Sequence, residues 1–169
     1  MKARVVYRQG LPLQVSSKTF ELLNNGLLYL QGRDRNYRPI LTVNIKFMIE
    51  NRDDPGLIVA TYCLTLEYLK HYSMKPGIIE NVVLIMNMAA FSFQNAPIYI
   101  AKHLINSIGA NYKGHARAVF MVNAPTAFSM VWNSIKYFLD ENQVRKVKIV
   151  SANTCPSLLE LAAPNQLEE

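Results

Sequence analysis

The residues that could carry chemistry in this chain are few, and they do not form the groupings that common catalytic sites use. His71, His103 and His115 are far apart in the sequence, and none has a second ligand at the short helical spacing of a metal site. Cys63 and Cys155 lack both metal-ligand spacing and the flanking residues of a familiar nucleophile. Acidic residues stand mostly beside expected helices, and they suggest no pair suited to acid–base work. The sequence therefore predicts a protein that is not an enzyme and that needs no metal or cofactor.

The tripeptide Asn-Ala-Pro occurs twice, at residues 95–97 and 123–125, and each copy stands where an expected helix begins. A phosphate cradle at such a corner needs glycines, so that consecutive backbone N–H groups can approach the phosphate. Proline removes one of those donors, and neither corner has a glycine loop. We therefore exclude a dinucleotide-binding or P-loop enzyme, and we expect each asparagine to cap a helix whose first turn contains the proline.

The composition indicates a single folded domain with an excess of basic residues. The chain has 169 residues, of which 50% are hydrophobic and 18% are charged, and its formal net charge is +6. A basic balance favours an anionic partner, which could be nucleic acid, a membrane surface or a phosphorylated small molecule. Because the basic residues are scattered and no nucleic-acid-binding motif is present, we expect no nucleic-acid partner. The lack of a secretory signal, a long apolar run and a disulfide framework indicates a cytoplasmic protein.

Apolar periodicity and capping residues predict helices that alternate with strands. The expected strands cover about residues 40–48, 82–88, 118–122 and 147–151. The expected helices lie within residues 12–24, opening at Ser16 or Ser17, and at about 56–71, 95–108, 125–139 and after Pro156. The run 82–88 is almost continuously apolar, which is typical of a strand covered on both faces in a parallel sheet. This order predicts an α/β sandwich with a largely parallel sheet and right-handed crossovers.

The helix expected at residues 125–139 has two apolar sides. At 100° per residue, Met130 and Tyr137 fall on one side and form a minor ridge. Either a neighbouring loop covers this ridge, or the helix covers a cavity or touches a membrane. Methionines such as Met48 and Met86 would give a cavity a flexible, polarizable lining, or they simply fill the core. The main apolar arc is about 120° wide and contains Phe128, Val131, Trp132, Ile135, Phe138 and Leu139.

Four stretches of the sequence, taken together, resemble a known domain family. They are GRDRNYRPIL at residues 32–41, VVLIMNMAAFS at 82–92, the block at 119–151 and LLELAAPNQLEE at 158–169. The most specific feature is the second Asn-Ala-Pro corner, followed by the aromatic-rich helix and then by Phe-Leu-Asp. This pattern resembles the CRAL-TRIO lipid-binding domain of phosphatidylinositol transfer proteins, cellular retinaldehyde-binding protein and the α-tocopherol transfer protein. The resemblance covers about residues 16–169.

The resemblance implies an α/β sandwich in which a hydrophobic pocket lies between a sheet floor and a mobile gate helix. By this similarity residues 125–139 form the gate, and the pocket holds one lipid-like molecule. Residues 1–169 are then one such domain, with a lead-in at 1–15 and without the helical subdomain that usually precedes it. We expect either a piece of a longer protein, truncated at its C-terminus, or a short divergent member. The implied ligand-binding residues are Val82, Leu84, Met86, Met88, Met121, Phe128, Val131, Trp132, Ile135 and Lys146.

The chain also departs from the family pattern. Tyr37 stands where the first turn often has glycine, and residues 87–90 replace an aspartate-x-x-glycine pattern after the central strand. Val82 and Leu84 occupy positions that carry hydroxyls in phosphatidylcholine-binding members, which argues against that ligand. Lys146 matches a lysine that contacts the inositol phosphate in phosphatidylinositol-binding members. The alternative is that Lys146 is a solvated charge among its basic neighbours.

The function implied by the resemblance is to bind one hydrophobic ligand and to transfer or present it between membranes, with phosphoinositide as one candidate ligand. The expected partners are therefore the lipid and, transiently, an anionic membrane surface, so that the protein would be cytoplasmic and peripherally membrane-associated. One alternative is a membrane-targeting or scaffold module of a larger protein, without lipid exchange. Another is an α/β enzyme with an unrecognised site, and the missing glycine loops and nucleophile elbow count against it.

Overall fold

A five-stranded sheet of order β1-β2-β3-β4-β5 forms the centre of the computed structural model, which describes residues 15–150 and 155–167. The antiparallel pair is β1 with β2, whereas β2, β3, β4 and β5 run parallel. This arrangement confirms the expected α/β class and the largely parallel sheet. The strands are β1 Leu28–Arg33, β2 Pro39–Asn44, β3 Val82–Asn87, β4 Ala116–Val122 and β5 Val147–Ile149.

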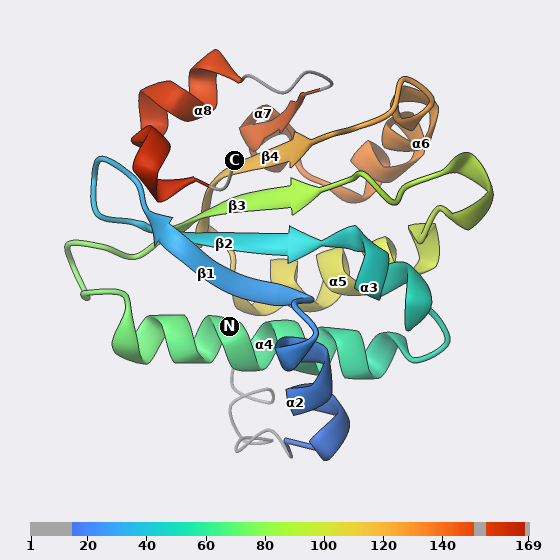
Figure 1. Cartoon of the computed structure of the whole chain (residues 1–169), viewed down its shortest axis with the longest axis horizontal. Helices are drawn as coiled ribbons and strands as arrows, with labels where there is room; N and C mark the ends of the chain where they lie inside the picture. The colour runs from blue at the N-terminus through green and yellow to red at the C-terminus, as the bar shows by residue number, and fades with distance from the viewer. Residues whose placement is uncertain (1–14, 151–154, 168–169) are drawn as a thin grey trace.

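Helices cover both faces of the sheet, with α4 and α5 on one side and α8 on the other (Figure 1). The α-helices are α2 Ser17–Asn24, α3 Ile45–Glu50, α4 Pro55–Tyr72, α5 Ile98–Asn111, α6 Phe128–Ile135, α7 Glu141–Lys146 and α8 Pro156–Leu161. Three short 3-10 helices are η1 Phe93–Asn95, η2 Lys136–Phe138 and η3 Pro164–Gln166. The expected helix start at Ser16 is confirmed, because Ser16 caps α2. Helix α4 begins close to the expected residue 56, where Asp54 caps the helix ahead of a first-turn proline.

Buried apolar residues form two clusters, one on each face of the sheet. Alternation along β3 assigns its side chains to them: Val82 belongs to the larger cluster, whereas Val83 and Ile85 belong to the smaller one. The larger cluster includes residues of α4, α5 and α6, and the smaller one includes Leu158 of α8. Strand β3 is therefore covered on both faces, as its continuous apolar run predicts.

Three elements differ from the expectation drawn from the sequence. The expected strand 40–48 ends at Asn44, because the Asn44 side chain accepts the backbone N–H of Lys46 and starts α3. Strand β1 was not expected: it lies between the end of the first expected helix and the middle of the polar turn, and it gains its partner only by pairing with β2. Helix α7 was also not expected, although Asp140 and Gln143 form a capping box at its start.

Both Asn-Ala-Pro corners differ from the expectation that asparagine caps the helix. The Asn95 side chain accepts the N–H of Ser92 at 2.7 Å and donates to the Ala90 carbonyl at 3.1 Å, and α5 begins only at Ile98. Asn123 has φ +56°, and α6 begins five residues after it without a side-chain cap. Each asparagine therefore stabilises the turn between a strand and the next helix, and neither caps the helix. Asn95 does so through its side-chain hydrogen bonds, and Asn123 does so by adopting a left-handed backbone conformation.

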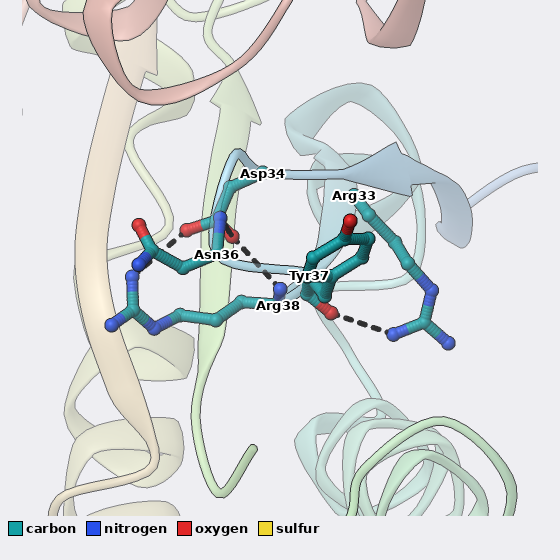
Figure 2. A network of polar contacts seen from close by, with 5 residues as sticks. All are labelled: Arg33, Asp34, Asn36, Tyr37 and Arg38. Atoms are coloured by element: carbon teal, nitrogen blue, oxygen red, sulfur yellow. Dashed lines mark hydrogen bonds and ion pairs between the residues drawn. The ribbon is translucent and has the colours of Figure 1, made fainter. Parts of the chain in front are cut away.

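The turn between β1 and β2 is organised around the carboxylate of Asp34 (Figure 2). Its Oδ1 accepts the backbone N–H groups of Asn36 and Arg38, both at 2.8 Å, and its Oδ2 pairs with the Arg38 guanidinium at 3.0 Å. The Asp34 side chain is fully buried, so these donors replace its hydration. This network explains the run of polar residues that the sequence places between two strands.

Tyr37 occupies the left-handed backbone region in this turn, with φ +62°. Its carbonyl accepts a hydrogen bond of 2.7 Å from Arg33, which also donates to the Ser73 carbonyl at the end of α4 (Figure 2 shows the first of these bonds). The resemblance places glycine here, and glycine is the residue that adopts this conformation without strain. The side chain of Tyr37 is 72% exposed, so no packing holds it in place.

Candidate functional site

An apolar cavity of about 260 Å³ lies between one face of the sheet and the helices α4, α5 and α6. Its floor comes from alternate residues of the strands, because side chains two apart in a strand point to the same face. On β3 and the residue after it, these are Val82, Leu84, Met86 and Met88. From the opposite side, α6 contributes Phe128, Trp132 and Ile135, together with Leu139 just beyond η2.

Nine of the ten residues expected at the pocket line this cavity, and Val131 does not. Val131 is nevertheless buried, with 3% of its surface exposed, and it packs within the larger cluster. Residues 128, 132, 135 and 139 follow one another at spacings of four and three, so they form one stripe along the helix. Val131 lies one position off that stripe, and an arc 120° wide was too broad to separate lining from ordinary core. The residues that line the cavity as expected are Val82, Leu84, Met86, Met88, Met121, Phe128, Trp132, Ile135 and Lys146.

Part of the wall was missed by the sequence reasoning. Strand β2 contributes Leu41 and Val43, and α4 contributes Tyr62 and Leu66. The alternation of apolar residues at 41, 43 and 45 gives one signal, but the sequence does not say which face of β2 the cavity adjoins. Helix α5 also lines the cavity, through Ala101, Leu104, Ile105 and Ile108, which recur at helical spacing.

One end of the cavity is polar and basic, at the start of β4. Lys113, His115, Gln143 and Lys146 are among the lining residues there. The Lys146 ammonium donates to the carbonyl of Ala116, the first residue of β4, at 2.8 Å. Lys146 is therefore held at the cavity wall, and it is not the freely solvated charge that was the alternative to a ligand contact.

Residues 23–169 match the family model described as CRAL/TRIO domain. The chain belongs to the CRAL/TRIO domain family. Among curated proteins, the phosphatidylinositol/phosphatidylcholine transfer proteins SFH9 and SFH11 of Arabidopsis thaliana are 33% identical over 61 residues and 36% identical over 64 residues. These matches cover 36% and 37% of this chain, but only 10% and 17% of the two relatives. Sec14 cytosolic factor of Schizosaccharomyces pombe is 34% identical over 86 residues, which are 50% of this chain and 30% of that protein.

A solved structure supports the assignment at the level of the fold. The crystal structure of Sfh5 superposes with a TM-score of 0.71 at 19% identity, covering 85% of this chain and 54% of that one. The CRAL/TRIO chain thus spans about half of that neighbour and less than a third of the curated relatives named above. Within the described residues, no helix is both long and apolar enough to cross a bilayer.

At the polar end of the cavity, Tyr112 takes part in a small network that joins α4 to the end of α5. The Glu67 carboxylate accepts a hydrogen bond of 2.8 Å from the Tyr112 hydroxyl and pairs with the Lys70 ammonium at 3.2 Å. Partial burial by itself would raise the pKa of Glu67. The hydrogen bonds from Tyr112 and Lys70, with the charges of Lys70 and His71, outweigh it, so the pKa of Glu67 lies below its usual value.

The outer side of α6 and η2 carries exposed apolar residues. Met130 is 67% and Tyr137 is 82% exposed, which places the minor ridge on the surface, away from the cavity. Phe138, expected in the buried arc, is 38% exposed and lies 5.4 Å from the ammonium of Lys102 on α5. The reason is that residues 136–138 form a 3-10 turn, whose three-residue period shifts the side chains that follow.

The segment that builds this side of the CRAL/TRIO domain is free of acidic residues. From residue 81 to residue 139 the sequence contains no aspartate or glutamate, but it contains Lys102, Lys113, Arg117 and Lys136. The ammonium of Lys136 lies 5.9 Å from the centre of the Tyr137 ring. Basic and aromatic side chains thus occur together on the outer surface of α5, α6 and η2.

Proposed function

We propose that this CRAL/TRIO domain holds one lipid-like ligand in its cavity and transfers or presents it between membranes. The observation that carries the proposal is the apolar cavity of about 260 Å³, walled by the sheet and by α4, α5 and α6. Burying ligand carbon there would stabilise the complex by about 25 cal/mol per Å² of apolar surface. The names of the relatives as phosphatidylinositol/phosphatidylcholine transfer proteins support the same activity.

In the same proposal, α6 and η2 act as the gate. One stripe of this segment lines the cavity, while its other side is exposed, so moving the segment outward would open the cavity to the surface. A diacyl lipid is larger than the space enclosed in this conformation, and we infer that the gate moves outward when the ligand enters. A phosphoinositide is the favoured ligand because Lys146 is positioned at the basic end, where a phosphate group would complement its charge.

The acid-free surface of α5, α6 and η2 is the proposed site of contact with a membrane. Lysines near a bilayer are attracted by anionic lipids, and aromatic side chains favour the interface between water and hydrocarbon. Met130, Tyr137, Lys102 and Lys136 supply both kinds of side chain next to the gate. Contact at this surface would place the opening of the cavity at the membrane from which the lipid is taken.

The proposal is tested by extracting the natively purified full chain with organic solvent and identifying the extract by mass spectrometry. The matched variants are Ala101→Phe, which places a ring in the cavity from α5, and Asn106→Phe, which adds the same ring at an exposed position of the same helix. We expect about one lipid per wild-type chain, retention in Asn106→Phe and loss in Ala101→Phe, because the added ring fills the space needed by the ligand.

The extract also names the headgroup, so phosphoinositide is supported only if an inositol phospholipid is recovered. An empty wild-type chain that still binds anionic vesicles would instead favour a membrane-targeting module without lipid exchange. Equal lipid loading of all three folded proteins would show that the cavity is not where the lipid binds.

A further inference from the structure

We propose that Tyr62 makes the cavity selective for a lipid that carries an uncharged oxygen acceptor within its buried portion. This inference rests on the proposed function, since it concerns the ligand of the same cavity. It means that the ligand must match a polar group in the wall, in addition to fitting the shape and the apolar surface of the cavity.

The hydroxyl of Tyr62 is buried with a weak partner. Tyr62 lies in the middle of α4, is 6% exposed and lines the cavity. Its Oη donates to the thioether sulfur of Met48 at 3.6 Å, and thioethers are poor acceptors. Buried tyrosine hydroxyls normally find a strong partner, so a stronger acceptor could replace Met48 as the partner of this single O–H donor.

Tyr112, the other hydroxyl-bearing residue among the described residues that line the cavity, is already engaged. Its Oη donates to the Glu67 carboxylate at 2.8 Å, a charge-assisted bond that a neutral ligand oxygen would not displace. The described lining contains no serine or threonine. Tyr62 is therefore the hydroxyl that a ligand would meet.

The position of Tyr62 decides which part of the ligand is recognised. The basic end of the cavity lies at the start of β4, where Lys146 binds Ala116, and Glu67 of α4 lies near it through Tyr112. Tyr62 is five residues from Glu67 along α4, which is about 7.5 Å of helix. Its partner Met48 belongs to α3, which follows the C-terminal end of β2. Because β2 and β4 run in the same direction, this end lies at the sheet edge opposite the start of β4. The oxygen that Tyr62 recognises thus belongs to the chain or ring of the ligand and not to a headgroup at the basic end.

Energetics favour an acceptor at this point. A purely hydrocarbon ligand would leave the hydroxyl with Met48, whereas a ketone, ester or hydroxyl oxygen would replace that weak bond with a normal one. Burial raises the pKa of Tyr62 far above neutrality, so the hydroxyl stays a donor throughout the physiological range. Sites that offer a buried donor reject analogues without the matching acceptor.

The test compares two probes of equal chain length, n-pentadecane and 8-pentadecanone, which has a ketone at its centre. Both are delivered from cyclodextrin to the full chain, and binding is measured as displacement of a fluorescent fatty acid. The wild type should prefer the ketone, and Tyr62→Phe should lower the ratio of ketone to alkane affinity about fivefold, as expected for one neutral hydrogen bond. Met48→Leu should raise the preference, because it removes the competing acceptor.

The control is Tyr68→Phe, the same change at an exposed position of α4 that does not line the cavity, and it should leave both affinities unchanged. Equal preference in wild type and Tyr62→Phe, with both probes bound, would overturn the role of Tyr62 and leave the lipid-binding proposal standing. If neither probe nor the fluorescent fatty acid bound the wild type, the lipid-binding proposal would fail together with this inference.

Discussion

At the scale of single residues, the clearest strain in the molecule is at Tyr37. A non-glycine residue in the left-handed region costs about 1–2 kcal/mol, and the exposed ring gains nothing from packing to offset that cost. Its backbone groups are engaged, since the N–H donates to the Asp34 carbonyl and the carbonyl accepts from Arg33. The turn network therefore holds the backbone in place and tolerates the strain.

Replacing Tyr37 with glycine should stabilise the protein. The backbone hydrogen bonds are kept and the steric strain is removed, while the greater freedom of glycine in the unfolded chain subtracts part of the gain. We expect an increase of about 0.5–1 kcal/mol in the free energy of unfolding, measured by urea denaturation. Tyr37→Ala serves as the control, because alanine keeps a Cβ and should give no such gain; equal stability of the two variants would contradict the account.

At the scale of elements, α4 and the end of α5 are joined by Glu67, and this contact makes stability depend on pH. A carboxyl group whose pKa is lower in the folded than in the unfolded state contributes stability above its unfolded pKa. That contribution is lost as the pH falls through the lower, folded pKa. We therefore expect the free energy of unfolding to decrease below about pH 4.5, the ordinary pKa of glutamate.

The variant Glu67→Gln should be less stable at pH 7 and should show a shallower decrease below pH 4.5, because it no longer has a proton to bind there. Urea denaturation at several pH values measures both effects. Glu21→Gln, which removes a carboxylate from the exposed surface of α2, should keep the wild-type slope. An unchanged slope in Glu67→Gln would show that the contact between α4 and α5 has no part in acid sensitivity.

At the scale of the whole molecule, the distribution of charge is more informative than its sum. The acid-free stretch from residue 81 to residue 139 includes α5, α6 and η2, and the last two form the proposed gate. A net charge of +6 alone favours any anionic partner. The structure brings Lys102 and Lys136 beside exposed aromatic rings, which suits a bilayer.

Neutralising these two lysines together, as Lys102→Gln with Lys136→Gln, should weaken binding to vesicles that contain anionic phospholipid. At about 1 kcal/mol per lysine near a charged surface, we expect about a 30-fold loss of affinity in a vesicle sedimentation assay at low salt. The matched control is Lys18→Gln with Lys75→Gln, which removes the same charge from exposed positions elsewhere. Equal losses in both pairs would mean that net charge, and not this surface, drives the association.

The sequence by itself determined the class of fold, the existence of most elements and, through the family resemblance, nine of the residues that line the cavity. Continuous apolar runs, Ser16, Asp54 and the methionine-rich strands are local signals, and local signals survive in a linear pattern. The tertiary structure alone decided the pairing of β1, the roles of Asn95 and Asn123, the exclusion of Val131 from the cavity, the place of Tyr62 and the hydrogen bond of Lys146 to Ala116. These features depend on which surfaces meet after the chain has folded. The apolar periodicity of a helix or strand shows which side is buried, but it does not show whether that side faces a cavity or packed side chains.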